Sequence, residues 1–211
     1  MSTISIIGAG GMAAAIAGRA VQAGYTVEVT SRDAAKAQAL AKRLGPGAST
    51  STYASALAGD LVILAVPYSA ALEVVAEYGE HLAGQILVDI TNPVAPDYTS
   101  FVTPADSSGA MEISRAAPAK TYIVKAFNTH FSHVIARGSF KGRPLDVPVA
   151  GDNAPAKRQV ASFVERLGFI PLDAGNLAMA RTLEHACLLS LGLMRHSLKH
   201  TNFAIGIEAF P

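Results

Sequence analysis

The sequence of 211 residues contains little cysteine, little net charge and no long apolar run. Its one cysteine, Cys187, cannot form an internal disulfide, which is compatible with a reducing compartment. Lys and Arg number 17 against 16 Asp and Glu, so the net charge of +1 predicts no bulk attraction to nucleic acid or to anionic membranes. No apolar stretch is long enough to span a bilayer, and the first residues lack the basic and apolar regions of a secretion signal. We therefore expect a cytoplasmic protein that binds neither membranes nor nucleic acid.

Hydrophobic residues are abundant, at 50% of the chain, and they predict a globular protein with a sizeable core. Short β-rich runs alternate with Ala-rich helical stretches, and runs such as 61–66 are apolar throughout, as strands covered on both faces are. The alternation predicts a doubly wound, Rossmann-type α/β fold with a mainly parallel sheet. The expected strands are 3–7, 26–30, 61–66, 85–90, 122–127, 147–150 and 169–172. The expected helices are 12–23, 34–44, 69–78, 110–117 and 154–167.

The end of the chain changes character. After residue 175 the pattern turns helical from about 176 to 199, as one long helix or a helix pair. We therefore expect a dinucleotide-binding domain in residues 1–175 and a small C-terminal helical segment in residues 176–211. This segment would pack on the same domain or on a partner subunit, and its apolar side chains favour a homodimer. These apolar residues include Leu188, Leu189, Leu191 and Leu193.

A proline-containing segment, residues 91–120, directly follows the expected strand 85–90. Ligands of open α/β sheets bind beyond the carboxyl ends of strands, so this segment is either a loop that covers a ligand or an ordinary crossover.

A glycine-rich turn follows the first expected strand. Gly8 allows a tight turn, Gly10 lets a phosphate approach the backbone, and Ala13 lets the next helix pack close to the strand. The helix that opens near Met12 directs free N–H groups and its positive dipole end at a pyrophosphate. Because the trio lies between a strand and an Ala-rich helix that leads to a second strand, it predicts a dinucleotide site.

The second expected strand ends in Thr30-Ser31-Arg32, where NAD-binding proteins carry an acidic residue that holds the adenosine ribose. A carboxylate there would repel the 2′-phosphate of NADP. The Ser31 hydroxyl and the Arg32 guanidinium can instead hold that phosphate, and Lys36 can add a second positive charge. Arg32 and Lys36 can also be ordinary solvated residues at a helix start. The pattern favours NADP(H) over NAD.

Whole motifs of the sequence resemble a known family, the NADP oxidoreductases that use the deazaflavin coenzyme called factor 420, together with their relatives of unassigned acceptor. The resemblance extends over nearly the whole chain. It rests on seven segments in order, namely SIIGAGGMAAAIA, VTSRD, DLVILAVP, ILVDITNPV, IVKAFNT, DVPVAGDN and LGFIPLDAGNLAMARTLE. The nucleotide-binding domain of the six-span metalloreductases looks similar too.

The resemblance implies site residues, carried over one by one. Some would contact the pyrophosphate, some the 2′-phosphate, and some would flank the nicotinamide side. With Gly8 and Ala13 of the glycine-rich turn, the predicted cofactor-binding residues are, in chain order, Gly8, Gly10, Gly11, Met12, Ala13, Ser31, Arg32, Lys36, Ala65, Val66, Pro67, Asn92 and Pro93. Asn128 and Thr129 would form the floor of the acceptor site, and with His130 they are the candidate catalytic residues. Deazaflavin-using members often carry His-Thr where this chain has Asn128-Thr129, so a deazaflavin and a flavin both stay candidate second substrates.

Three roles are compatible with these residues. Hydride transfer between a nicotinamide and a planar ring needs two stacked carbons in a dry slot and little else, because positioning supplies most of the rate. Reduction of a small carbonyl or imine needs a proton donor, for which Lys125, His130 and His133 are candidates, although we rather expect Lys125 to cap a strand end. The third role is NADP sensing without turnover. We expect the first role, an NADPH-dependent reductase whose partner is a small-molecule redox acceptor.

Two histidine pairs and the single cysteine suggest other chemistry. His130 and His133, and likewise His196 and His200, have the spacing of metal ligands. No Cys or carboxylate stands nearby at ligand spacing, so we expect no metal site. Cys187 lies in an apolar stretch, and we expect a buried apolar residue there rather than a nucleophile.

Overall fold

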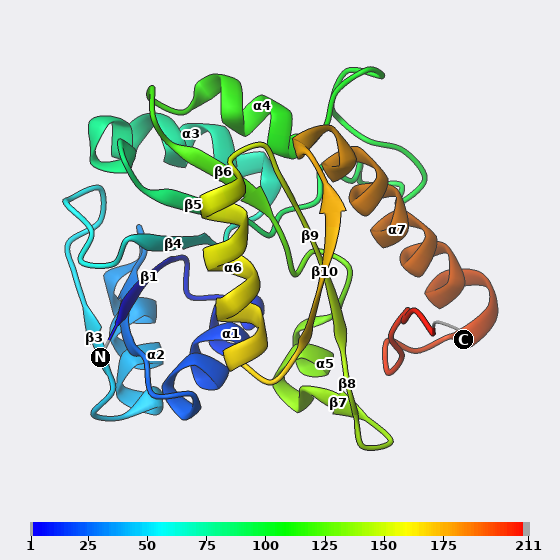
Figure 1. Ribbon diagram of the computed structural model, residues 1–211, viewed down its shortest axis with the longest axis horizontal. Coiled ribbons are helices and arrows are strands. Elements are labelled where there is room, and N and C mark those ends of the chain that lie inside the picture. Colours follow the sequence, from blue (N-terminus) through cyan, green and yellow to red (C-terminus); the bar gives the residue numbers. More distant parts are fainter. Residues whose placement is uncertain (1, 209–211) are drawn as a thin grey trace.

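Apolar strands build the centre of the molecule, which a computed structural model describes for residues 2–208. Within these residues, eight strands form one sheet in the order β10-β9-β6-β5-β4-β1-β2-β3 (Figure 1). The strands from β1 to β6 pair in parallel, whereas β9 pairs antiparallel with β6. The bounds are β1 Thr3–Ile7, β2 Thr26–Thr30, β3 Ala48–Thr50, β4 Leu61–Leu64, β5 Ile86–Asp89, β6 Tyr122–Lys125, β9 Asp146–Gly151 and β10 Ile170–Gly175.

Helices cover both faces of the sheet, as the apolar strands require. One core cluster joins the sheet to α1, α2, α5 and α6, and a second joins its other face to α3, α4 and the start of α7. Figure 1 shows α3 and α4 on the side of the sheet opposite α1 and α2. The bounds are α1 Gly11–Gln22, α2 Ala34–Leu44, α3 Tyr68–Tyr78, α4 Gly109–Ala116, α5 Ser132–Arg137, α6 Ala154–Arg166 and α7 Ala180–Leu193. The predicted Rossmann-type fold is confirmed.

Side chains fix where several helices begin. Asp33 accepts a hydrogen bond from the backbone of Lys36 at the start of α2, and Ser108 and Asn153 cap α4 and α6 in the same way. Gly10 stands at the corresponding position of α1 and has no side chain to offer. The N-terminus of α1 is therefore left for another acceptor.

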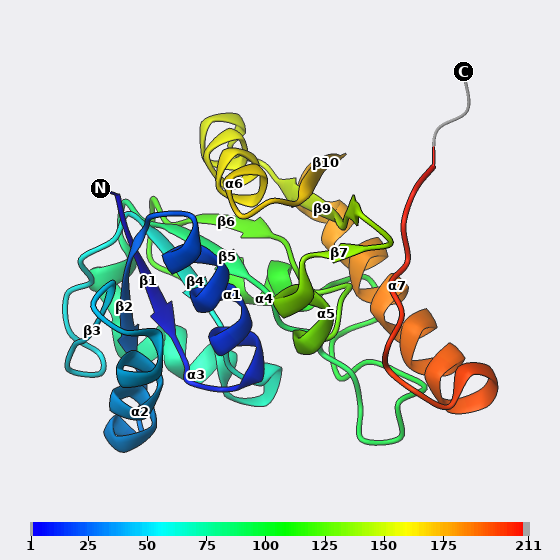
Figure 2. The same cartoon turned by 90° about the horizontal axis from the view of Figure 1, so that it is seen from below.

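The C-terminal part is helical, as predicted. The 3₁₀ turn Leu177–Met179 leads into α7, and a π turn, Met194–Leu198, follows it. The first half of α7 packs on α4 and β9, and its far end extends away from the sheet (Figure 2). Residues 200–208 then run back toward α5, where the ring of Phe203 lies 5.6 Å from that of Phe131.

Some short elements differ from the expectation. The strand β3, the helix α5 and the hairpin of β7 (Ser139–Phe140) and β8 (Arg143–Pro144) were not predicted. Each has six residues or fewer, which is too short for a hydrophobic period to stand out.

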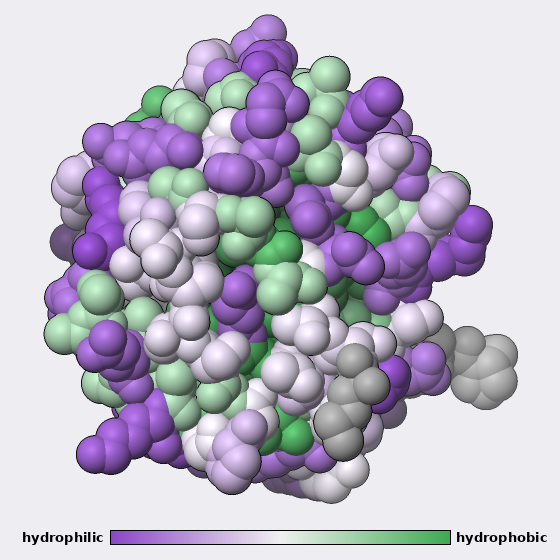
Figure 3. Space-filling model, turned by 90° about the vertical axis from the view of Figure 1, so that its left-hand side faces the viewer, coloured by the Kyte–Doolittle hydropathy of each residue, from purple (hydrophilic) through white to green (hydrophobic). Residues whose placement is uncertain are grey.

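The surface opposite α7 carries mostly polar and neutral residues, and hydrophobic residues show mainly in recesses between them (Figure 3). Over residues 2–208, no helix combines the length and the apolar character that crossing a bilayer requires.

Candidate functional site

The glycine-rich turn lies where β1 meets the end of β4. Gly8 adopts a φ of +121°, and a Cβ at this position would overlap the carbonyl oxygen of Ala65. Its N–H donates to the carbonyl of Thr30 at 2.8 Å, which ties the turn to the end of β2. Only glycine fits here, because both the backbone conformation and the close approach exclude a side chain.

The turn continues into an open space at the N-terminus of α1. No atom lies within 4 Å of the point where a Cβ of Gly10 would stand. The first backbone bond of the helix runs from Ala14 to the carbonyl of Gly10, and α1 has no side-chain cap. The N–H groups of its first turn thus form a cradle without a side-chain acceptor, and an anion such as a pyrophosphate fits that chemistry.

A cleft of about 590 Å³ runs from this cradle along the carboxyl ends of β4 and β5. Its far wall is the loop of residues 94–102, which follows β5. The lining residues are Gly10, Gly11, Met12, Ala65, Val66, Pro67, Tyr68, Ser69, Ile90, Thr91, Asn92, Val94, Ala95, Pro96, Tyr98 and Val102. The segment after β5 therefore borders a cleft, as the covering-loop interpretation expects.

A second cavity, of about 510 Å³, lies at the ends of β2 and β3, and Ser31 and Arg32 are among its lining residues. The Arg32 guanidinium is engaged by Glu73 of α3 at 2.9 Å, with both side chains more than half exposed. Lys36 is not among the lining residues, and its ammonium pairs with Asp33 at 3.2 Å. The cationic groups at this end are therefore accompanied by carboxylates, which the sequence interpretation did not include.

The structure brings most of the predicted cofactor residues to these two cavities. Seven of them line the cleft, namely Gly10, Gly11, Met12, Ala65, Val66, Pro67 and Asn92, and Ser31 and Arg32 line the second cavity. Four do not line either one, namely Gly8, Ala13, Lys36 and Pro93. Ala13 is fully buried against the core, which agrees with its predicted packing role.

The three candidate catalytic residues are not among the residues that line the cleft. The amide of Asn128 donates to the side-chain oxygen of Asn92 at 2.9 Å and to the carbonyl of Leu183 at 3.0 Å. Asn92 donates back to the carbonyl of Asn128 at 2.9 Å. Asn128 thus holds the cleft residue Asn92 in place through two hydrogen bonds. Thr129 follows Asn128 in the chain.

His130 is buried and bonded to the backbone. Its Nε2 lies 2.6 Å from the carbonyl oxygen of Asp146, so this nitrogen carries the proton and donates. Burial lowers the pKa of His130, and the contact with Asp146 opposes this shift only in part. His133 contacts the carbonyl of Thr201 at 3.0 Å. In residues 2–208, no three His, Cys, Asp or Glu side chains gather as metal ligands would.

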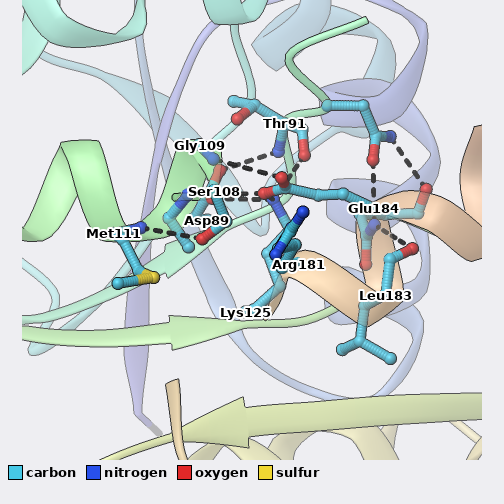
Figure 4. A network of polar contacts seen from close by, with 12 residues as sticks. Asp89, Thr91, Ser108, Gly109, Met111, Lys125, Arg181, Leu183 and Glu184 are labelled. Atoms are coloured by element: carbon cyan, nitrogen blue, oxygen red, sulfur yellow. Dashed lines mark hydrogen bonds and ion pairs between the residues drawn. The ribbon is translucent and has the colours of Figure 1, made fainter. Parts of the chain in front are cut away.

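A buried ionic cluster lies beneath the cleft, and sequence reasoning missed it. The Lys125 ammonium donates to Asp89 at 2.8 Å, to Glu184 at 2.8 Å and to the carbonyl of Thr91 at 2.5 Å (Figure 4). Lys125 and Asp89 have no exposed side-chain surface, and Glu184 is 1% exposed. Lys125 therefore does more than cap a strand end.

The cluster joins four elements. Asp89 ends β5, Lys125 ends β6, and Glu184 comes from α7. Glu184 also accepts hydrogen bonds from the N–H groups of Gly109 at 3.1 Å and Ala110 at 3.4 Å, at the start of α4. Because Asp89 and Lys125 end neighbouring buried strands, the sequence could have predicted an ion pair between them. Nothing in the sequence pairs Lys125 with Glu184.

The comparison with known families agrees with this geometry. Residues 3–93 match the family model described as coenzyme F420-dependent NADP oxidoreductase, F420 being the deazaflavin named above. The chain is similar to the F420-dependent NADP oxidoreductases. The matched stretch includes the glycine turn, the Ser31-Arg32 end of β2 and the cleft residues up to Asn92.

Individual relatives extend the similarity over most of the chain. An F420-dependent NADP reductase of Methanocaldococcus jannaschii is 29% identical over 71% of this chain and 67% of its own length. A crystal structure from Arthrobacter sp. FB24, provisionally named an F420-dependent NADP reductase, superposes with a TM-score of 0.87 at 26% identity and covers 98% of this chain and 99% of that one.

The metalloreductases are also relatives, as the sequence resemblance implied. Metalloreductase STEAP3 of Rattus norvegicus is 31% identical over 86% of this chain. The alignment spans only 35% of that protein. The chain thus matches about a third of the length of this curated relative.

Proposed function

We propose that the chain is an NADPH-dependent oxidoreductase that transfers a hydride between NADP(H) and a planar redox acceptor, a deazaflavin or a flavin. The family match and the reductase relatives support the reaction class and the cofactor. The observation that carries the choice of acceptor is the composition of the cleft wall.

The cleft offers little for acid–base chemistry. Its lining residues in the described chain include no Asp, Glu, Lys, Arg or His. The hydroxyl groups include that of Tyr68, and burial with the nearby charges of Glu112 and Glu184 raises its pKa to about 12. A carbonyl substrate needs a proton donor for the developing alkoxide, whereas hydride transfer to a planar ring depends mainly on stacking in a dry slot. The wall therefore favours the planar acceptor.

The order of the strands determines which way the cofactor would lie across the sheet edge. The cradle at Gly10 and α1 would hold the pyrophosphate, and the neighbouring end of β2 would hold the adenosine half with its 2′-phosphate at Ser31 and Arg32. The nicotinamide half would then extend the other way, past Ala65 toward Asn92 at the end of β5. When bound, NADPH supplies a hydride to the acceptor ring, which takes its further proton from solvent.

The loop of residues 94–102 supplies the wall opposite the glycine turn. Tyr98 and Val102 are large apolar residues that line the cleft and are 53% and 58% exposed. An exposed aromatic and an exposed aliphatic side chain at a cleft mouth suit the face of a planar ring.

The test is anaerobic oxidation of NADPH by the purified protein, with the deazaflavin coenzyme, FMN, FAD and a small cyclic imine each as sole acceptor. We expect turnover with the deazaflavin or a flavin and none with the imine. NADH with the same acceptors is the matched control for cofactor choice. Turnover with the imine alone would move the assignment to carbonyl or imine reduction, and tight NADPH binding without any turnover would favour a sensing module.

A further inference from the structure

The buried cluster of Asp89, Lys125 and Glu184 carries one net negative charge, since two carboxylates share one ammonium. The neighbouring groups donate to these carboxylates. The N–H of Thr91 donates to Asp89 at 2.8 Å, and that of Gly109 donates to Glu184 at 3.1 Å. Burial alone would lower the pKa of Lys125, but the two carboxylates outweigh it and raise that pKa, so the ammonium keeps its proton.

Two members of this cluster, Lys125 and Asp89, contact Thr91 of the cleft wall. The carbonyl of Thr91 accepts a hydrogen bond from Lys125 at 2.5 Å (Figure 4). Thr91 lines the cleft together with its neighbours Ile90 and Asn92. The intervening groups are buried, so water and salt screen the cluster far less than they screen a surface ion pair. The start of α4 at Gly109 supplies partial positive charge, and a helix N-terminus offsets only about half of a unit charge.

We infer that the cluster of Asp89, Lys125 and Glu184 makes the cleft favour the oxidised over the reduced nicotinamide, with Glu184 of α7 supplying the net negative charge. The inference rests on the proposed function, which puts the nicotinamide beside Asn92. The oxidised ring carries a positive charge that the reduced ring lacks. A fixed negative charge in a poorly screened place therefore lowers the free energy of the oxidised form selectively. Glu184 acts here through its charge and does not need to touch the cofactor.

The test compares dissociation constants for NADP⁺ and NADPH, measured by titration without any acceptor. Glu184→Gln removes the net charge and keeps the size of the side chain. We expect the ratio of the NADP⁺ constant to the NADPH constant to rise about five-fold, as a unit charge several ångströms away at an intermediate effective dielectric allows. Glu184→Asp keeps the charge and shortens the reach, so it should leave the ratio unchanged even if both forms bind more weakly. Glu165→Gln on α6, an exposed residue, is the control for net charge.

A merely structural role would weaken both cofactor forms alike, and an unchanged ratio in folded Glu184→Gln would overturn the inference. If that variant does not fold, Asp89→Asn removes the same charge from the other carboxylate. The wild-type protein supplies a third measurement, because clearly tighter binding of NADPH than of NADP⁺ would also contradict the inference. Failure of the wild-type protein to bind either form would instead reject the proposed function.

Discussion

Two glycines of the same turn serve different physical needs. At Gly8 a side chain would overlap the Ala65 carbonyl in a left-handed conformation, whereas at Gly10 the corresponding space is open. We expect Gly8→Ala to lower the free energy of unfolding by at least about 3 kcal/mol. Gly10→Ala should fold with nearly unchanged stability, because its methyl group meets no protein atom.

The same pair of variants tests the phosphate cradle. The methyl group of Gly10→Ala would occupy the space that a pyrophosphate needs, so we expect NADPH and NADH to bind about ten-fold more weakly. Denaturant unfolding and cofactor titration of both variants check the two expectations. Unchanged cofactor binding by Gly10→Ala would place the pyrophosphate elsewhere.

We propose that one exposed ion pair, Arg32 with Glu73, affects the choice between NADPH and NADH. Arg32 is engaged by Glu73 at 2.9 Å, so a 2′-phosphate has to compete with that carboxylate. We expect Arg32→Ala to weaken NADPH at least ten-fold and NADH little, because charge-assisted bonds to the phosphate are lost. Equal losses for both cofactors would contradict the assignment of Arg32.

We expect Glu73→Gln to have the opposite effect on NADPH binding from Arg32→Ala. Freeing Arg32 should tighten NADPH about two- to three-fold and leave NADH unchanged, an effect of the size that an exposed ion pair allows. Titrations at low and high salt check this, since the gain should shrink as salt screens the phosphate. Tighter binding of NADH would point to a general effect of Glu73 on the cavity.

At the scale of elements, α7 and the π turn that follows it hold the loop of residues 94–102 that forms one wall of the cleft. Arg195 donates to the carbonyl of Asp97 at 2.8 Å, and the ring of His185 packs against that of Phe101 at 4.8 Å. We expect Arg195→Ala to raise the KM for the acceptor several-fold and to leave the affinity for NADPH unchanged, because the loop lies on the acceptor side. Steady-state kinetics beside NADPH titration separate the two quantities, and a matching loss of NADPH affinity would refute the assignment.

At the scale of the whole molecule, stability should depend on His130. Burial lowers its pKa in the folded state, so protonation favours unfolding. The contribution of neutral His130 to the free energy of unfolding is full above the pKa of about 6.5 that the residue has in the unfolded chain. It is lost as the pH falls toward the lower pKa of the folded state. We expect His130→Gln, which keeps a donor for the Asp146 carbonyl, to show a smaller drop in Tm between pH 7 and pH 5. An equal drop in both proteins would contradict this prediction.

The assembly of the molecule is a further proposal at this scale. The far half of α7 extends from the sheet, and Leu189 is 57% exposed there. We propose that this part meets a second copy, and sedimentation velocity should give the mass of a homodimer. A monomeric mass at working concentration would reject the homodimer.

Local rules in the sequence were enough for the long elements and for the glycine turn. The strands β1 and β2 and the helix α2 have the predicted bounds, because periodic burial and the Asp33 cap are properties of neighbouring residues. Part of the demand for glycine at position 8 is equally local, since the turn itself needs a positive φ, whereas the close approach of the Ala65 carbonyl comes from the packing of β4. Composition, the order of strands and helices and the turn therefore determined the fold class and the general kind of site.

Only the tertiary structure decided which charges meet. Lys125 and Glu184 are 59 positions apart, and Arg32 and Glu73 are 41 apart. Their contacts depend on how α7 and α3 pack on the sheet, and no spacing in the sequence encodes that packing. The same reason explains why Asn128 and His130 do not line the cleft, since the end of a strand alone does not set the direction in which the following loop turns. Long-range packing therefore decided which polar and apolar side chains line the cleft.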